Sequence, residues 1–402
     1  MKLLYRKPML TLKILFWAML LIVFYTYLGY GILLYIILRL KRLFAGAPRK
    51  AVVPADEQLP TITLLICAYN EEDVVAEKMA NTLAIDYPRE KFRIMWVTDG
   101  STDRTNELLK AYPEVDIVFS PERRGKSAAL KHGLQELKTR YVAFTDANTM
   151  INPGAMKEIA RLFTDPTVGC VSGEKRVAAR KEGQMAAEGE GLYWRYESTL
   201  KRWDSELFSA MGAAGELYAI DPQLVREVPD NALLDDFMMS MFVVQDGKRI
   251  AYTPDAYAQE YGSANIFEES KRKRRIAAGG LQSIWWLRSL LNPIKYPLVS
   301  FQYISHRVLR WSVTPIAMVI LLGINVLLSV MRAGSFFDLM LAAQILFYLG
   351  AFAGWLLARH GVKNKLLYTA YYFVFMNLNV FRGMAYLRSH NHSGAWEKAK
   401  RS

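Results

Sequence analysis

Cysteine is scarce in this chain of 402 residues, in which only Cys67 and Cys170 occur, each within an apolar run. Two cysteines cannot build a disulfide framework, and they are too few for a zinc site made of cysteines. Lone cysteines in apolar runs are typical of buried thiols in a reducing compartment. The chain also lacks internal repeats and low-complexity segments, and 52% of its residues are apolar. This composition excludes a disordered or fibrous protein.

Charge is missing altogether from one long run near the N-terminus, Ile14–Leu38. A helix of this length exceeds the roughly 30 Å hydrocarbon core of a bilayer, so it predicts a membrane anchor. A signal peptide cleaved near Ala45-Gly46-Ala47 is the alternative. The run is much longer than a signal h-region and basic residues follow it, so we favour an uncleaved anchor.

Three further apolar runs lie near the C-terminus: Val313–Met331, Phe336–Ala358 and Leu366–Leu387. The first two predict clean membrane spans. The third contains two asparagines and an arginine, which are costly in lipid and are expected to face protein, water or headgroups. We expect this third run to span, although it can instead lie against the others. The Lys and Arg distribution leaves the orientation of both termini open.

Between these apolar ends, short apolar runs alternate with amphipathic stretches. This alternation predicts an α/β domain with a parallel sheet and helices on both faces. Such a sheet binds ligands beyond the carboxyl ends of its strands. The predicted strands are 61–68, 92–98, 115–119, 141–145 and 168–172, and the predicted helices are 72–84, 103–111, 125–137, 152–163 and 237–245.

Polar motifs follow three of these strands: Ala68-Tyr69-Asn70-Glu71, Asp99-Gly100-Ser101-Thr102-Asp103 and Asp146-Ala147-Asn148. Each motif alone is compatible with an ordinary helix cap. Acids that crowd one edge of a sheet repel each other, however, and such clusters usually bind a divalent cation.

Together with Arg124-Gly125-Lys126 and Asp235-Asp236, these motifs resemble the membrane-bound family 2 glycosyltransferases, over roughly residues 60–280. That family includes bacterial synthases of cellulose, hyaluronan and poly-N-acetylglucosamine. The resemblance implies a GT-A domain, which is Rossmann-like α/β, with flanking transmembrane helices. It also implies a bacterial inner-membrane protein whose catalytic domain is cytoplasmic. We accordingly expect five regions: 1–50 (anchor and linker), 51–270 (GT-A domain), 271–312 (basic segment and interfacial helices), 313–388 (transmembrane helices) and 389–402 (basic tail).

The resemblance implies a nucleotide-sugar donor site in the first half of the domain. Its base and ribose would lie near Tyr69 and Asp99, and a carboxylate suits the imide of a uridine donor. The diphosphate would lie at Gly125 and Lys126. Tyr69 can alternatively cover the sheet edge, and Lys126 can simply begin a solvated helix. The implied donor-site residues are Ala68, Tyr69, Asn70, Glu71, Asp99, Gly125, Lys126, Asp146 and Arg275.

The family's metal motif, DxD, matches Asp146 and Asn148, with asparagine in place of the second acid. Mg²⁺ or Mn²⁺ bound there would neutralise the leaving diphosphate. The motif position also assigns Asp236 as the general base, with Asp235 capping the helix that follows. The alternative is that both acids are only an N-cap pair.

The acceptor segment of the family matches the aromatic run around Trp194 and the small residues Gly212 and Gly215. These aromatics can alternatively pack a helix against the domain or the membrane. The basic run Lys271–Arg275 either attracts anionic lipid or supplies Arg275 to the diphosphate. The family's QxxRW motif lies here, but its Gln and its Trp are missing, which argues against processive polymerisation.

These observations predict an inverting glycosyltransferase that moves a sugar to a lipid-linked or glycan acceptor beside membrane lipids, and the resemblance implies a UDP-linked donor. A processive polysaccharide synthase is the alternative within the same class. A non-catalytic membrane scaffold of glycan synthesis is the alternative from another class, because Asn148 and Ile276 depart from the family pattern. The net charge of +13 gathers around membrane segments, so no nucleic-acid partner is expected. The oligomeric state stays open.

Overall fold

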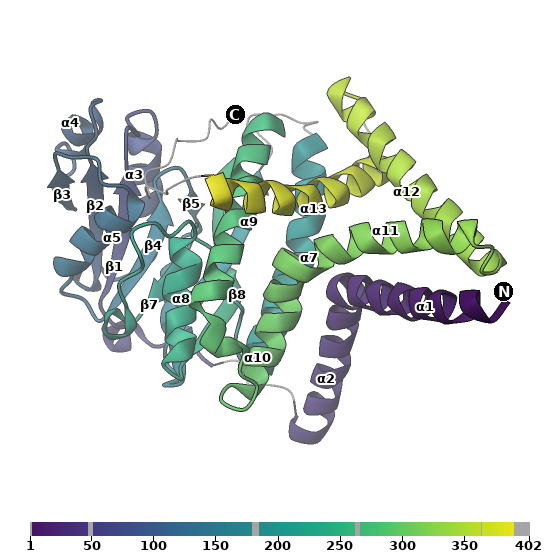
Figure 1. The fold of residues 1–402 in the computed structure, drawn as a ribbon. Coiled ribbons are helices and arrows are strands. Elements are labelled where there is room, and N and C mark those ends of the chain that lie inside the picture. The colour runs from purple at the N-terminus through teal and green to yellow at the C-terminus, as the bar shows by residue number, and fades with distance from the viewer. Residues whose placement is uncertain (1, 47–50, 179–184, 262–265, 363, 390–402) are drawn as a thin grey trace.

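A computed structural model describes residues 2–46, 51–178, 185–261, 266–362 and 364–389 of the chain. The predicted basic tail lies almost entirely outside these residues. The described part has two halves, which are an α/β domain built on one sheet and a group of long helices beside it (Figure 1).

Within the described residues the sheet has eight strands, in the order β3-β2-β1-β4-β7-β6-β8-β5. Apolar runs predicted β1, β2, β3, β4 and β6 to within a few residues, except that β6 continues well beyond its predicted end. The strands are β1 (Ile62–Ala68), β2 (Phe92–Asp99), β3 (Val115–Ser120), β4 (Tyr141–Asp146), β5 (Met150–Ile151), β6 (Val168–Ala178), β7 (Tyr218–Ile220) and β8 (Arg249–Tyr261).

The prediction of an entirely parallel sheet is wrong at β7 and β5, while β6 and β8 are parallel to each other. Strands β3, β2, β1 and β4 are parallel neighbours, as expected. The short strand β7 then enters between β4 and β6 and is antiparallel to both. Strand β5 is likewise antiparallel to β8. Strands of two or three residues are too short to produce an apolar run, so the sequence pattern could not reveal them.

Helices cover both faces of the sheet, as predicted for an α/β domain. One core layer joins β1 and β2 to α3, α4 and α6, and the other joins them to α5 and α8. Neighbouring β1 residues alternate between the layers, since Leu64 belongs to the first and Leu65 to the second. These helices are α3 (Val75–Leu83), α4 (Thr105–Leu109), α5 (Lys126–Gln135), α6 (Ala155–Leu162) and α8 (Asp235–Gln245).

The predicted N-terminal anchor is not one straight helix. It consists of α1 (Lys2–Phe24) and α2 (Tyr30–Ala45), joined by the π-helical turn η1 (Tyr25–Gly29). At that turn the chain changes direction, so that α1 lies beside α11 (Thr314–Val330) while α2 lies beside α7 (Met185–Leu207) (Figure 1). A π-turn is an established cause of such a bend.

Three helices among the described residues are long and apolar enough to cross a membrane: Lys7–Ala45, Pro297–Val330 and Ser335–Arg359. The second joins α10 (Pro297–Tyr303), the π-helix η6 (Ile304–Val313) and α11, and the third is α12 (Ser335–Arg359). Short 3₁₀ turns are η2 (Asp56–Gln58), η3 (Arg89–Lys91), η4 (Pro222–Leu224) and η5 (Arg288–Leu291).

The last predicted span, residues 366–387, is not among these candidates. It forms α13 (Lys365–Ser389), which lies across α9 (Ile266–Trp286) (Figure 1). The two helices approach so closely that a Cβ at Gly383 would lie 2.7 Å from the backbone N of Ala278. The costly polar residues face protein, as expected: Asn379 and Arg382 both contact Ser270 Oγ.

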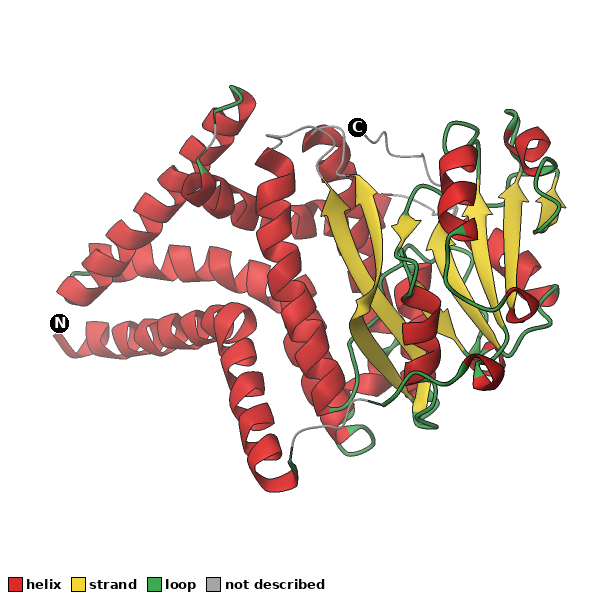
Figure 2. Ribbon diagram, turned by 180° about the vertical axis from the view of Figure 1, so that it is seen from behind, coloured by secondary structure: helices red, strands yellow, loops and turns green. Residues whose placement is uncertain are grey.

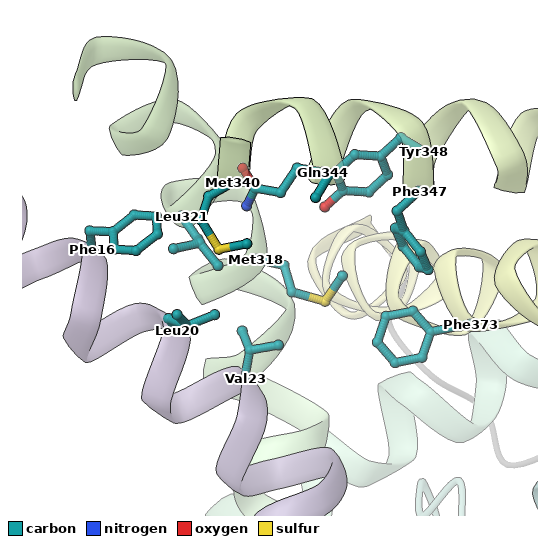
Figure 3. Close-up of a pocket in the computed structure, with 11 residues that line it drawn as sticks. Phe16, Leu20, Val23, Met318, Leu321, Met340, Gln344, Phe347, Tyr348 and Phe373 are labelled. Carbon is teal, nitrogen blue, oxygen red and sulfur yellow. The ribbon is translucent and has the colours of Figure 1, made fainter. Parts of the chain in front are cut away.

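Packing between α1, α11, α12 and α13 leaves an apolar cavity of about 280 Å³ (Figure 3). Phe16, Met318, Phe347 and Phe373 are among its lining residues, and Gln344 is one of its few polar side chains. None of the predicted site residues lines this cavity. The polar chemistry must therefore be sought at the edge of the sheet.

Candidate functional site

The carboxyl ends of the parallel strands lie along one edge of the sheet, at the arrowheads in Figure 2, and Asp99 and Asp146 are the last residues of β2 and β4. Cys67, near the end of β1, marks the centre of this edge. Lys126, Asp235, Asp146 and Asp99 all act electrostatically on its thiol, although burial is the main reason that its pKa is raised to about 12. Four segments that are distant in sequence thus contribute charges to one region, as the motifs predicted.

Hydrogen bonds join the loop after β1 to the loop after β2. Asn70, whose φ is 52°, donates its backbone N–H to Ser101 Oγ, and its side-chain Oδ1 accepts from the N–H of Thr102 at 2.8 Å. The N–H of Glu71 similarly donates to Thr105 Oγ1 at 2.8 Å. The first two motifs therefore form one rigid wall of the site.

Asp99 shapes the loop that precedes α5. Its Oδ2 accepts from the N–H of Gly125 at 2.7 Å and its Oδ1 accepts from the N–H of Arg124 at 2.9 Å. Sequence reasoning placed Asp99 on the nucleoside base, and it did not foresee this bond to the loop. The Tyr69 ring is covered by the guanidinium of Arg123, 3.9 Å from the ring centre.

Lys126 begins α5, immediately after Gly125, whose φ of 94° places the turn in a region that favours glycine. Its Nζ lies 2.9 Å from Asp146 Oδ1. Although burial opposes it, Asp146 and then Asp235 raise the pKa of Lys126, so its ammonium stays charged. Lys126 thus begins a helix, as its alternative reading required, and it also pairs with Asp146.

Two side chains of α3 form hydrogen bonds with the segment that carries Asp146 and Asn148 and with the residues that follow it. The fully buried Lys78 donates from Nζ to the carbonyl of Thr149 at 2.5 Å. One turn later, Asn81 pairs with both the N–H and the carbonyl of Ile151, at 2.9 and 2.8 Å. Burial lowers the pKa of Lys78 to about 7. Sequence reasoning missed both residues, although a lysine on the apolar face of a helix was a visible signal.

Asp236 lies near the N-terminus of α8 and faces Gly215. Its Oδ1 accepts from the N–H of Phe237 at 2.8 Å, and a Cβ added at Gly215 would lie 2.7 Å from its Oδ2. Burial, and then the charge of Asp235, raise the pKa of Asp236 to about 6. The prediction that Asp235 caps the helix is wrong, because Leu234 is the cap position. Among the described residues, the buried Asp235 Oδ2 has no hydrogen-bond partner.

The two predicted acceptor glycines lie beside the start of α8. Gly212 has a φ of 93°, and a Cβ there would lie 2.2 Å from the ring of Phe237, so only glycine fits. The ring of Trp194 has the ammonium groups of Lys175 and Lys273 at 5.2 and 5.6 Å from its centre. Such cation–π contacts favour the alternative in which Trp194 packs a helix against the domain. They do not exclude a role for Trp194 in binding the acceptor.

The basic run of α9 reaches the site through Arg272. This residue forms ion pairs with Glu216 at 3.4 Å and with Glu260 at 3.2 Å, and the buried Lys175 contacts both acids. Glu216 follows Gly215 directly, so this cluster fixes the loop against which Asp236 lies. Sequence reasoning assigned Arg275 here and did not foresee the role of Arg272. The run is also less available to lipid than predicted, because Lys273 is buried against Glu269.

A buried ionic network ties the same loop to the membrane helices. Glu197 on α7 pairs with Arg307 at 2.6 Å and with Arg310 at 2.8 Å, both on η6. Arg307 also donates from Nε to the carbonyl of Met211 at 2.8 Å. His306 bridges Glu197 and Asp204. None of these residues was predicted, because their sequence separation exceeds what any local pattern reveals.

Comparisons with known proteins agree with this geometry. The family described as "Glycosyl transferase family 2" matches residues 63–220. Poly-beta-1,6-N-acetyl-D-glucosamine synthase from Staphylococcus aureus (strain MSSA476) is 36% identical over 247 residues, which are 60% of this chain and 58% of that protein. Beta-monoglucosyldiacylglycerol synthase from Nostoc sp. (strain PCC 7120 / SAG 25.82 / UTEX 2576) is 26% identical over 253 residues, which are 58% of this chain and 52% of that protein. The matched segments thus span little more than half the length of these curated relatives.

Among solved structures, mannosyltransferase PcManGT from Pyrobaculum calidifontis, in complex with GDP-Man and Mn²⁺, superimposes with a TM-score of 0.69 at 22% identity. The match covers 95% of this chain and all of that one. At this identity the likeness concerns the fold, and it includes the flanking helices as well as the sheet.

Proposed function

We propose that this chain, whose residues 63–220 are a family 2 glycosyltransferase domain, transfers a sugar with inversion from a nucleotide-sugar to an acceptor hydroxyl at a membrane surface. The observation that carries the proposal is the meeting of Lys126, Asp146, Asp235 and Asp236 at one edge of the sheet. A cation suited to a diphosphate thus lies close to a carboxylate suited to accept a proton.

Asp236 is the proposed general base. As the acceptor oxygen attacks the anomeric carbon, a new C–O bond forms and the bond from that carbon to the diphosphate oxygen breaks. The acceptor proton passes to the Asp236 carboxylate, and the nucleotide diphosphate leaves with the electron pair. A pKa of about 6 leaves Asp236 ionised at neutral pH while making it a stronger base than an ordinary aspartate.

The diphosphate is proposed to bind at the start of α5. There the Lys126 ammonium and the backbone N–H groups at a helix N-terminus favour an anion. Asp99 supports this arrangement by holding the preceding loop through two backbone N–H groups. We propose a UDP-linked donor on the strength of the family resemblance, with the nucleoside between the walls formed by Tyr69, Asn70 and Glu71. Arg275 remains a proposed partner of the departing diphosphate.

Asp146 and Asn148 would hold a divalent cation, Mg²⁺ or Mn²⁺, and PcManGT was solved with Mn²⁺. The donor set fits, since a carboxylate and an amide oxygen are hard ligands, and the buried Asp235 Oδ2 nearby has no hydrogen-bond partner in the described residues. No group of three or more His, Cys, Asp or Glu side chains that could hold a metal ion occurs within those residues. When bound, the cation neutralises charge on the leaving group.

The acceptor is proposed to lie beside Trp194, Gly212 and Gly215, on the side of Asp236 that faces the membrane helices. Three helices among the described residues are long and apolar enough to span a membrane, and this supports the proposal of a lipid-linked acceptor. We propose a cytoplasmic catalytic domain at a bacterial inner membrane. Single addition is the preferred mode, because Arg272 and Ile276 replace the Gln and the Trp of the family motif. Processive synthesis is the second candidate, favoured by the 36% identity to a polysaccharide synthase.

The decisive experiment incubates the purified chain with a panel of nucleotide-sugars and a membrane lipid extract, and measures the product mass. A mass increase of one sugar supports single addition, and a ladder of masses supports polymerisation. Asp236→Asn should abolish transfer while nucleotide-sugar binding persists. If no nucleotide-sugar yields product or free nucleotide diphosphate, the proposed function is wrong.

A further inference from the structure

Helix α2 has two different faces, although the whole N-terminal run was expected to form one anchor. On one face Tyr30, Leu34 and Leu38 have at most 2% of their surface exposed. On the opposite face an apolar stripe at helical spacing is 48–76% exposed, and its residues are Ile32, Ile36, Leu40 and Leu43. A continuous apolar stripe on the outside of a protein marks a contact with another protein or with a membrane. The exposed stripe of α2 therefore calls for a partner.

The buried face of α2 runs along α7 in the same direction. The contacts, in order along both helices, are Gly31 with Leu200, Tyr35 with Trp203 and Arg42 with Glu206. Helix α7 also packs against β6 and β8, and its Arg202 is exposed. A sheet with open edges does not occur in lipid hydrocarbon, and an exposed arginine is costly there. Because α2 is packed along α7, it is held outside the hydrocarbon core together with the sheet domain.

The turn η1 between α1 and α2 is fixed by hydrogen bonds to other helices. Three consecutive side chains of this turn reach η6, α11 and α13. The pairs are Tyr25–Ser305, Thr26–Thr314 and Tyr27–Asn377, with oxygen–oxygen distances of 2.7, 2.8 and 2.6 Å. After the turn, α2 runs in a different direction from α1 in both ribbon views (Figures 1 and 2). The two helices are therefore not one straight span.

Helix α1 is long enough to cross a bilayer without α2. Its 23 residues extend about 34 Å, whereas the hydrocarbon core is roughly 30 Å thick. It also lies beside α11, which belongs to another candidate span. A membrane anchor at the N-terminus therefore does not require α2.

The charge of α2 indicates which surface its stripe meets. The helix carries Arg39, Lys41 and Arg42 near its C-terminus and has no acid in its sequence. Within the described residues only Arg42 of these three pairs with an acid, which is Glu206. This end of the helix thus stays positive. An apolar stripe combined with basic residues is typical of a helix that lies in the headgroup layer of a membrane, where anionic lipids attract the basic residues.

We infer that α2 is not part of a membrane span but lies flat in the membrane surface, with its exposed stripe against acyl chains and its basic end among anionic headgroups. The partner of the stripe is therefore the lipid bilayer itself. Because the other face of α2 is fixed to α7, the helix sets the distance of the sheet domain from the lipid. The inference rests on the proposed location at a membrane and not on sugar transfer.

Depth measurements with nitroxide labels test this inference. The full-length chain, with Cys67 and Cys170 replaced by alanine, is reconstituted in vesicles of phosphatidylethanolamine and phosphatidylglycerol. Single labels are attached through Ile32→Cys, Ile36→Cys, Leu40→Cys and Leu43→Cys. They should be open to dissolved oxygen and shielded from a water-soluble relaxation agent, at depths within about 5 Å of one another. A spanning α2 would instead separate the first and last labels by about 16 Å in depth, at about 1.5 Å per residue.

Helix α1 supplies the matched control. Its residues Ile14, Trp17, Leu21 and Phe24 are apolar, 48–64% exposed and similarly spaced. Labels at these four positions should differ in depth by about 15 Å from the first to the last, because α1 crosses the bilayer. The comparison between the two helices is made within one protein and one preparation, so it does not depend on how the depth scale is calibrated.

The unaltered chain provides a second measurement that needs no labelled variant. A phospholipid with a photoreactive group near its glycerol should crosslink along the exposed stripe of α2. A phospholipid with the same group at the end of an acyl chain should crosslink to α1 and not to α2. Mass spectrometry of the crosslinked peptides identifies the residues.

A depth gradient on α2 like that on α1 would overturn the inference, as would crosslinking of α2 to the end of an acyl chain. Labels on α2 that are open to the water-soluble agent would overturn it as well. Labels that neither agent reaches would place a protein surface, such as a second copy of this chain, on the stripe and would also overturn it. If the labels on α1 lie in water too, the proposed membrane location fails with it. Sugar transfer is assayed separately and can stand or fail independently of these depths.

Discussion

Replacing Gly215 with alanine should displace the proposed base while leaving the fold intact. The added Cβ would lie 2.7 Å from Asp236 Oδ2, whereas ordinary contacts begin near 3.4 Å, so the carboxylate must move by about 0.7 Å. The backbone of Gly215 does not have the positive φ that would strain an alanine. Overpacking of this kind costs about 1–3 kcal/mol of stability.

The expected kinetic effect of Gly215→Ala is a fall in kcat of about 10- to 100-fold, because misplacing a reacting group by about 1 Å costs on the order of 100-fold. The affinity for nucleotide-sugar should be unchanged, since the donor residues lie on other loops. The assay is release of nucleotide diphosphate in the presence of membrane lipid extract, together with a separate measurement of donor binding.

Gly154→Ala is the matched control, because a Cβ at Gly154 meets nothing within 4 Å and its φ of −81° suits alanine. This variant should keep the kcat of the unaltered chain. If Gly215→Ala is as active as Gly154→Ala, Asp236 does not act from the position that the structure gives it, and its assignment as the base fails.

Three further outcomes are expected. The kcat should be flat above about pH 7, half-maximal near pH 6 and should fall about tenfold per pH unit well below that, because protonation of Asp236, with its pKa of about 6, removes the base; a profile that stays flat down to pH 4.5 would exclude this. Asp146→Ala should abolish the stimulation of donor binding by Mg²⁺ or Mn²⁺, and a chelator that leaves donor binding unchanged would contradict the metal assignment. Lys78→Met should raise the metal concentration needed for half-maximal activity by about tenfold, because it removes the hydrogen bond from Lys78 to the loop that carries Asp146 and Asn148. The control is Lys110→Met, at an exposed position. An equal metal requirement in the two variants would refute the role of Lys78 in holding this loop.

The sequence predicted the likeness to family 2 glycosyltransferases, the central strands and the sheet edge because these depend on local patterns. Apolar runs end at the loops after β1, β2 and β4, and the family comparison confirms the resemblance that those loops carry. The role of Asp236 remains a prediction, although its burial and its neighbour Asp235 agree with it. The same reasoning could not foresee β7, because three residues produce no periodic signal.

Contacts between distant segments account for the other differences. The sequence around Asp99 does not indicate that its carboxylate accepts hydrogen bonds from the N–H groups of Arg124 and Gly125. The sequence around Arg272 likewise does not indicate its ion pair with Glu216. The bend at Tyr25–Gly29 was also invisible, because a hydropathy profile measures the length of an apolar helix and not its direction. The lysine at position 78 was visible but was not interpreted.

The loop Met211–Glu216 explains why the catalytic domain and the membrane helices act as one unit. Arg307, from the helix that continues into α11, holds the carbonyl of Met211, and Arg272 on α9 holds the side chain of Glu216. Between these two anchors lies Gly215, against which the Asp236 carboxylate is packed. A shift of α9 or η6 would therefore move Gly215 and change its contact with the Asp236 carboxylate. The helices that pack beside the sheet domain thus hold the loop against which the proposed base lies.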